Sequence, residues 1–223
     1  MKKITISFLA IFTLFVTKVQ GQEFEPSLAE ALDRFKTDTT LPQAAMTTNQ
    51  LEMIAKKWND NWLAHYYASY AYTVHSFMEK EESRRDGVLD MADNHIEKAK
   101  ELYGNESDEI YVLYALIASA RLSVKPGSRW KEYGAIFEEN INKAKQLNPD
   151  NPRIYYLQGE NLFYTPKMFG GGAKSAIPYY EKADSIFKIL PLPDSLNLEP
   201  SWGMYQNTDM LNKAKQEVDK RKK

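Results

Sequence analysis

The sequence contains no cysteine. The chain can therefore form no disulfide and cannot carry a lipid on an N-terminal cysteine, and it has no thiol nucleophile. It also lacks a Gly-x-Ser-x-Gly elbow, so the common serine nucleophile is missing as well. We predict no enzymatic reaction and no cofactor for this chain.

Histidine is scarce, with only His65, His75 and His95. His65 and His75 are ten residues apart on one predicted helix, which at about 100° and about 1.5 Å per residue puts them about 80° apart around the axis and about 15 Å apart along it, so they cannot readily share a metal. His95 has carboxylates close in sequence but no HExxH or comparable spacing. A metal site and a purely structural role both stay open for these histidines. The spacing favours the structural role, so no metal site is predicted.

No strongly basic segment dominates the chain, which has 29 Lys and Arg against 30 Asp and Glu. Binding to nucleic acid depends on concentrated Lys and Arg. The balanced charge therefore excludes nucleic acid as an expected partner.

The N-terminus has the pattern of a secretory signal. Lys2 and Lys3 precede an apolar run at residues 4–16, and Gly21 supplies the small residue at a cleavage site. The apolar run is too short for a comfortable membrane span, although an uncleaved anchor is the alternative. We predict a signal peptide at residues 1–21 cleaved after Gly21, a mature chain of residues 22–223 with no membrane span, and a periplasmic or secreted location.

Period-two alternation, the signature of β-strands, does not stand out anywhere. Apolar residues recur at helical spacing instead, so the sequence predicts an all-α protein. The expected helices cover residues 25–36, 42–58, 62–77, 87–103, 110–124, 130–147 and 175–189, with a terminal helix at 207–221.

An internal repeat organises these helices. Ala99, Ala144 and Ala183 end similar segments that are spaced by about 45 and then about 39 residues. Each is preceded at four-then-three spacing by two inward residues, which share one helical face. Repeated helix pairs of this kind are typical of helical solenoids. The predicted repeats are approximately residues 61–104, 106–149 and 152–189.

These repeats resemble the tetratricopeptide repeat family. The segment Tyr155-Tyr156-Leu157-Gln158-Gly159 is similar to the first helix of that family, and Ala176, Tyr180 and Ala183 are similar to its second helix, with Pro149 at the repeat end. The resemblance implies a right-handed α-α superhelix. Because the family period is about 34 residues, the longer units here imply insertions between paired helices, at residues 125–129 and 165–172.

A narrower resemblance is to tetratricopeptide-like periplasmic proteins, including the T component of tripartite ATP-independent transporters. It rests on Pro166 followed by Phe169, Gly170, Gly171 and Gly172. The same segment invites comparison with a phosphate-binding loop, but that motif needs a glycine directly before the lysine, and Ala173 stands there. We expect the glycines to allow positive φ and close backbone approach.

Aromatic residues are abundant, with 14 Tyr and 4 Trp. Helical solenoids form a concave groove, and such rings are frequent anchors of bound peptides. Tyr66, Tyr70 and Tyr114 are therefore hypotheses for a groove, and packing between repeats is the alternative for each ring. The sequence favours a non-catalytic binding or scaffold protein with a protein or peptide partner. The alternative is a soluble periplasmic component of a transport system that binds a small solute.

Overall fold

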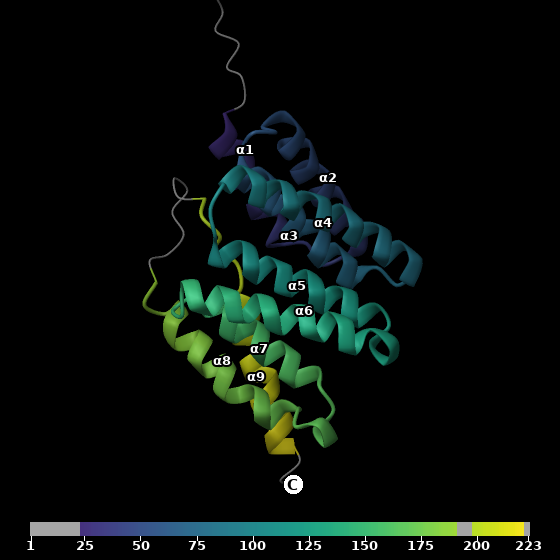
Figure 1. The fold of residues 1–223 in the computed structure, drawn as a ribbon, viewed down its shortest axis with the longest axis vertical. Helices are drawn as coiled ribbons and strands as arrows, with labels where there is room; N and C mark the ends of the chain where they lie inside the picture. The colour runs from purple at the N-terminus through teal and green to yellow at the C-terminus, as the bar shows by residue number, and fades with distance from the viewer. Residues whose placement is uncertain (1–22, 191–197, 221–223) are drawn as a thin grey trace, which may run out of the picture.

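The computed structural model describes residues 23–190 and 198–220, and the predicted signal peptide lies outside them. The described residues form an all-α fold with no strand (Figure 1). Its elements are α1 (Phe24–Phe35), α2 (Leu41–Lys57), α3 (Trp62–Met78), α4 (Glu82–Tyr103), α5 (Asp108–Val124), α6 (Pro126–Leu147), α7 (Pro152–Tyr164), the 3-10 turn η1 (Lys167–Phe169), α8 (Ala173–Phe187) and α9 (Met204–Lys220).

Local sequence signals fix several helix ends. The side chains of Thr40, Asn61, Ser107 and Asn151 cap the first turns of α2, α3, α5 and α7 by accepting backbone N–H bonds. At the end of α4, Gly104 adopts a left-handed conformation with φ of 75°. The expected helices are thus present because both their periodicity and their caps favour them.

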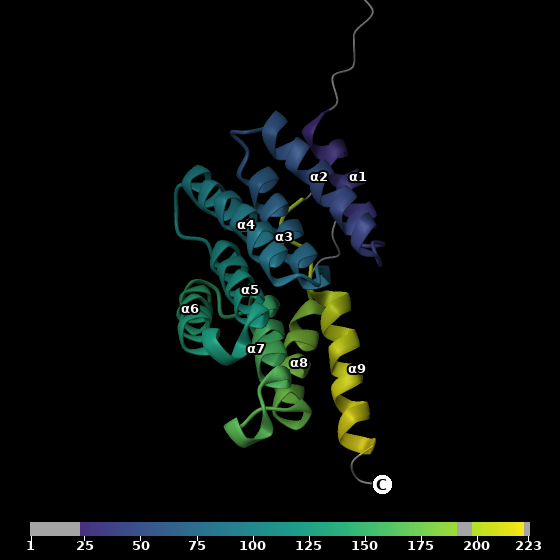
Figure 2. The same cartoon turned by 90° about the vertical axis from the view of Figure 1, so that its right-hand side faces the viewer.

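The helices pack as successive antiparallel pairs along the long axis of the molecule (Figures 1 and 2). The helix α3 packs on α4, α5 on α6 and α7 on α8, while α9 covers α8. Contacts of α3 with α5 and of α5 with α7 join neighbouring pairs through their first helices. This arrangement confirms the predicted all-α array of helix pairs, as in a helical solenoid.

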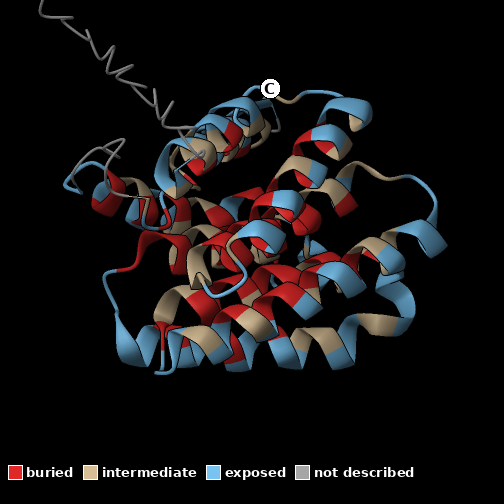
Figure 3. Cartoon of the chain, turned by 90° about the horizontal axis from the view of Figure 1, so that it is seen from above, coloured by how far each residue is buried: buried red, intermediate tan, exposed pale blue. Residues whose placement is uncertain are grey.

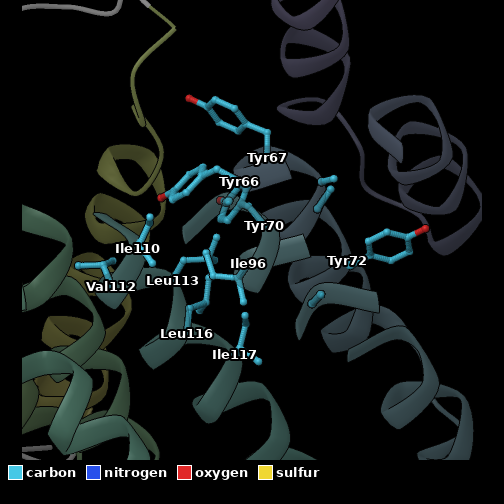
Figure 4. Close-up of a cluster of buried hydrophobic side chains, with 14 of the residues drawn as sticks. Tyr66, Tyr67, Tyr70, Tyr72, Ile96, Ile110, Val112, Leu113, Leu116 and Ile117 are labelled. Atoms are coloured by element: carbon cyan, nitrogen blue, oxygen red, sulfur yellow. The ribbon is translucent and has the colours of Figure 1, made fainter. Parts of the chain in front are cut away.

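Buried residues concentrate where the pairs meet, and exposed residues cover the outside (Figure 3). Ten residues of α5 are buried, as its nearly uniform apolar sequence predicts. Figure 4 shows tyrosines of α3 leaving the helix in different directions, with Tyr72 turned away from Tyr66 and Tyr67. The helix α3 is therefore a central element with packed neighbours on several sides.

The predicted insertion at residues 125–129 is wrong, because residues 126–129 form the start of α6 and only Lys125 separates α5 from α6. Pro126 ends α5 and also occupies the first position of α6, where its missing N–H costs no intrahelical bond. The helix α4 likewise begins at Glu82, five residues before the expected start, and includes Gly87.

The second expected insertion, residues 165–172, is a loop that contains η1. Gly170 and Gly172 have φ of 86° and 96°, as expected for glycines that permit positive φ. A Cβ on Gly171 would lie 2.1 Å from the carbonyl oxygen of Thr165, so the close backbone approach is made within this helix pair. Among the described residues, no helix is both long and apolar enough to cross a membrane.

Candidate functional site

A cavity of about 1660 Å³ lies on the side of the array formed by the first helix of each pair. Its wall comes from α1, α3, α5 and α7, with the starts of α6 and α9. Residues 198–203, here called the strap, close part of the same wall before α9 begins. We call this space the central cavity.

Three aromatic residues from distant parts of the chain meet in the central cavity. The ring of Trp202 in the strap stacks on Tyr70 of α3, with centroids 4.8 Å apart and planes inclined by 22°. Tyr156 of α7 meets the same indole edge-on at 6.5 Å. Since aromatic pairs in offset or edge-on geometry attract one another, these rings hold a flat apolar wall in place.

Hydrogen bonds fasten the strap to the helices. The indole N–H of Trp202 donates to the Tyr66 hydroxyl at 2.8 Å, and the Tyr67 hydroxyl donates to the backbone carbonyl of Glu199 at 3.1 Å. The guanidinium of Arg153 donates to the backbone carbonyl of Trp202 at 3.2 Å. The strap is therefore bound to both α3 and α7 through polar contacts behind its aromatic face.

A buried ion pair supports these contacts. Arg153 on α7 donates from Nε to Glu109 on α5 at 2.9 Å, and its Nη2 also contacts that carboxylate. Asn151 donates to the same carboxylate at 2.7 Å. Burial raises the pKa of Glu109 despite the neighbouring Arg153. The pair ties two helices together directly behind the strap.

The rim of the central cavity carries large apolar side chains that are open to solvent. Trp130 is 58% exposed and Phe169 is 72% exposed, although both line the cavity. Three further rim residues are exposed aromatics: Phe77, Tyr164 and Tyr205. Large exposed apolar side chains around a hollow are typical of a ligand or protein binding site.

Three buried phenols of the central cavity, those of Tyr67, Tyr70 and Tyr156, favour their neutral form. Burial raises the pKa of Tyr67 and Tyr70, and it raises that of Tyr156 well above the usual value for tyrosine. These residues can therefore donate hydrogen bonds and offer ring faces, whereas the anionic phenolate is disfavoured.

The tyrosines predicted from the sequence occupy three different surroundings. Tyr70 lines the central cavity, whereas Tyr66 is fully buried behind it and accepts the Trp202 bond. Tyr114 borders a separate pocket of about 410 Å³ and donates to Glu97 at 2.7 Å. From the predicted glycine-rich loop, Phe169 reaches the rim of the central cavity. The structure thus brings together Tyr70 and Phe169 at one site and does not bring Tyr114 there.

Sequence reasoning missed Trp202 and the histidine contact. Trp202 lies 136 residues from Tyr66, and only its position shortly after Pro200 signalled an ordered loop. His65 and His95 approach with Nδ1 atoms 2.9 Å apart, and His95 Nε2 lies 2.5 Å from Glu52. His65 and His95 each lie 15 residues from position 80 in the α3–α4 turn. In an antiparallel helix pair, residues at equal distances from the turn lie side by side, so the sequence did contain a signal for this contact. No cluster suited to a metal ion occurs in the described ranges.

Comparison with known proteins finds a likeness to a solved structure. The chain is similar to the solved structure of the HusA haemophore from Porphyromonas gingivalis, with 31% sequence identity and a TM-score of 0.75. The match covers 89% of this chain and 96% of that one. No family model matches the chain, and no curated protein matches it either.

Proposed function

The chain belongs to the family of the HusA haemophore, and from this membership we propose that it is an exported, non-catalytic binding protein for a haem-type tetrapyrrole. The ligand occupies the central cavity. Of the two ligand classes expected from the sequence, this proposal favours a small solute over a protein or peptide partner. Export is supported by the signal pattern at residues 1–21.

The size and lining of the central cavity carry this proposal. At about 1660 Å³ it exceeds the roughly 300–1,000 Å³ that suit an ordinary small ligand. Its wall combines stacked rings at Tyr70 and Trp202 with aliphatic residues such as Leu116 and Leu157. A large, flat and mostly apolar molecule buries the most surface against such a wall, and a tetrapyrrole has that shape.

The lining favours recognition of the ring over coordination of its iron. No histidine lines the cavity within the described part of the chain. Tyrosine ligates haem iron in catalase, but burial disfavours the phenolate of Tyr67, Tyr70 and Tyr156, and the other two tyrosines of the lining, Tyr164 and Tyr205, lie on its exposed rim. Met204 also lines the cavity, and a methionine ligand in cytochromes acts together with a histidine. Stacking and apolar contact are therefore the main sources of affinity.

The proposal is tested by titrating the mature chain with haem while following the haem absorbance band and tryptophan fluorescence. We expect saturable binding of one haem per chain. Trp130→Ala, Tyr164→Ala and Phe169→Ala each remove an exposed rim ring. Because these rings are exposed, their loss should weaken binding several-fold with little effect on the melting temperature.

Met53→Ala is a matched control, because Met53 is 64% exposed on α2 and does not line the central cavity. It should bind haem as the unaltered chain does. Absence of saturable haem binding would overturn the proposal. Equal weakening by Met53→Ala and by the rim variants would show that haem adheres to exposed apolar surface in general.

A further inference from the structure

Arg85 is a cation of the central cavity that has no ion-pair partner among the described residues. Arg85 on α4 lines the cavity, and its Nη1 and Nη2 donate to the carbonyl and hydroxyl of Ser123 in the last turn of α5. Its Nε is buried and has no hydrogen-bond acceptor among the described residues. A buried donor without an acceptor is costly, which points to an acceptor that the chain itself does not supply.

The other charged groups of the lining leave Arg85 uncompensated. Lys36 pairs with Asp33 at 2.9 Å, and Glu160 accepts a bond from the Tyr180 hydroxyl. Asp38 also lines the cavity, and its Oδ2 is buried without a hydrogen-bond partner among the described residues, so it does not neutralise Arg85. Within the described ranges, no carboxylate pairs with this arginine.

Two other arginines, Arg121 and Arg129, do have carboxylate partners. Arg129 binds the Asp86 carboxylate with two bonds of 2.7 Å, and Arg121 contacts three aspartates of α4. Asp86 is the residue next to Arg85, and its carboxylate serves Arg129 and Arg121 instead. The aspartates of α4 thus neutralise Arg121 and Arg129 and leave Arg85 without a carboxylate partner among the described residues.

We propose that Arg85 is a carboxylate subsite of the central cavity, so that the ligand is an amphipathic acid and not a neutral molecule. This inference rests on the proposed function and adds the chemistry at one end of the ligand. The carboxylate accepts a bond from the guanidinium of Arg85, which is half-buried in the wall, and the apolar body of the ligand extends toward Tyr70 and Trp202. Charge-assisted bonds of arginine to carboxylates are strong and directional, particularly away from bulk water.

The test compares metal-free protoporphyrin IX, which carries two carboxylates, with its dimethyl ester. The unaltered chain should bind the diacid at least about tenfold more tightly than the ester, as expected for one charge-assisted bond. Arg85→Gln should abolish this preference, and Arg85→Lys should keep part of it. Arg84→Gln is the matched control, because Arg84 is exposed, pairs with Glu81 and does not line the central cavity. It should keep the full preference.

Equal affinity of the unaltered chain for diacid and ester would overturn the carboxylate subsite and leave the tetrapyrrole function standing. A preference that survives in Arg85→Gln would also overturn it. If Arg85→Gln does not fold, the preference of the unaltered chain and its reduction in Arg85→Lys decide the question.

A second pair of probes separates this inference from the proposed function. If neither tetrapyrrole binds, the proposed function fails, and palmitic acid is then compared with its methyl ester. A preference for the acid that disappears in Arg85→Gln supports the subsite with a different apolar body. Equal binding of both, or binding of neither, removes the subsite as well.

Discussion

Arg153 and Glu109 form a two-point ion pair between α7 and α5, with the Arg153 side chain only 8% exposed. The same guanidinium donates to the carbonyl of Trp202. One buried side chain thus holds together two helix pairs and the strap that walls the central cavity. A single contact of this kind couples the stability of the array to the shape of the binding site.

Removing one partner of this pair should destabilise the fold strongly. Glu109→Gln leaves the Arg153 charge buried without its counterion, and such losses cost about 3–5 kcal/mol. We expect that decrease in the free energy of unfolding measured by urea denaturation. The double change Glu109→Gln with Arg153→Met should recover part of it, because no unpaired charge then remains. A free energy of unfolding for Glu109→Gln within about 0.5 kcal/mol of that of the unaltered chain would contradict this role.

Replacement of two helical glycines by alanine should change the stability of the fold in opposite directions. A Cβ on Gly159 of α7 would lie 2.6 Å from the buried ring of Tyr180 on α8, whereas nothing lies within 4 Å of one on Gly87 of α4. We expect Gly159→Ala to cost about 1–3 kcal/mol through overpacking. Gly87→Ala should stabilise by about 0.4–1 kcal/mol, since alanine favours the helix. Thermal unfolding of both variants checks the difference, and equal shifts would contradict it.

The helices were predictable because each has local causes: caps at Asn61 and Ser107, and apolar periodicity within one segment. The pairing also followed from the sequence, since Ala99, Ala144 and Ala183 mark the repeating unit. Pro126 was misread because a proline both breaks one helix and begins another, and sequence alone does not separate these roles.

The site was less predictable, because its parts are far apart in the chain. Tyr70 was found as an aromatic of an inner helix, but its stacking partner Trp202 belongs to a strap that returns from the other end of the chain. Tyr114 has the same chemistry and a similar helical setting, yet it faces a different pocket. Composition identifies candidate rings, whereas the direction in which each ring points depends on long-range packing.

Acidification should destabilise the protein through the contact between His65 and His95. His65 Nε2 lies 3.2 Å from the carbonyl of Asn59, which can only accept, so Nε2 carries the proton and Nδ1 of neutral His65 accepts from His95. Burial lowers the pKa of His65, and the charge of His95 lowers it further. A second proton would set two donors against each other at 2.9 Å.

The sign of the effect follows from these shifts. Below the ordinary histidine pKa of about 6.5, the unfolded chain binds a proton that folded His65 resists, so the free energy of unfolding falls as pH falls. Burial would raise the pKa of Glu52, but hydrogen bonds from Lys56 and His95 lower it overall. Protonation of Glu52 at still lower pH should therefore reduce the free energy of unfolding further. Burial also lowers the pKa of His75, with the same sign.

Urea denaturation between pH 7 and pH 5 should therefore show decreasing stability, by up to about 1.4 kcal/mol per pH unit for each proton. His65→Gln should give a shallower dependence, because one of the titrating groups is gone. Parallel curves for the unaltered chain and His65→Gln would exclude His65 as a source of the pH dependence.

Tryptophan fluorescence should report where the ligand binds. Of the four tryptophans, Trp130 and Trp202 line the central cavity, whereas Trp58 and Trp62 do not. Quenching by bound haem should decrease in Trp130→Phe and in Trp202→Phe and should persist in Trp58→Phe. Trp202→Phe also removes the donor to Tyr66, so its melting temperature should drop while that of Trp130→Phe stays near the original. A loss of quenching in Trp58→Phe alone would place the ligand outside the cavity.

Binding should depend little on the iron. Because no histidine lines the central cavity in the described residues and burial keeps Tyr67 and Tyr70 neutral, we expect metal-free protoporphyrin IX to bind within about tenfold of haem. Tyr67→Phe and Tyr70→Phe keep the rings and remove the hydroxyls. Both variants should leave the absorbance band of bound haem unchanged, because we expect neither hydroxyl to be a ligand of the iron. A shift of that band in either variant, together with weak binding of the metal-free ring, would show that a tyrosine coordinates the iron.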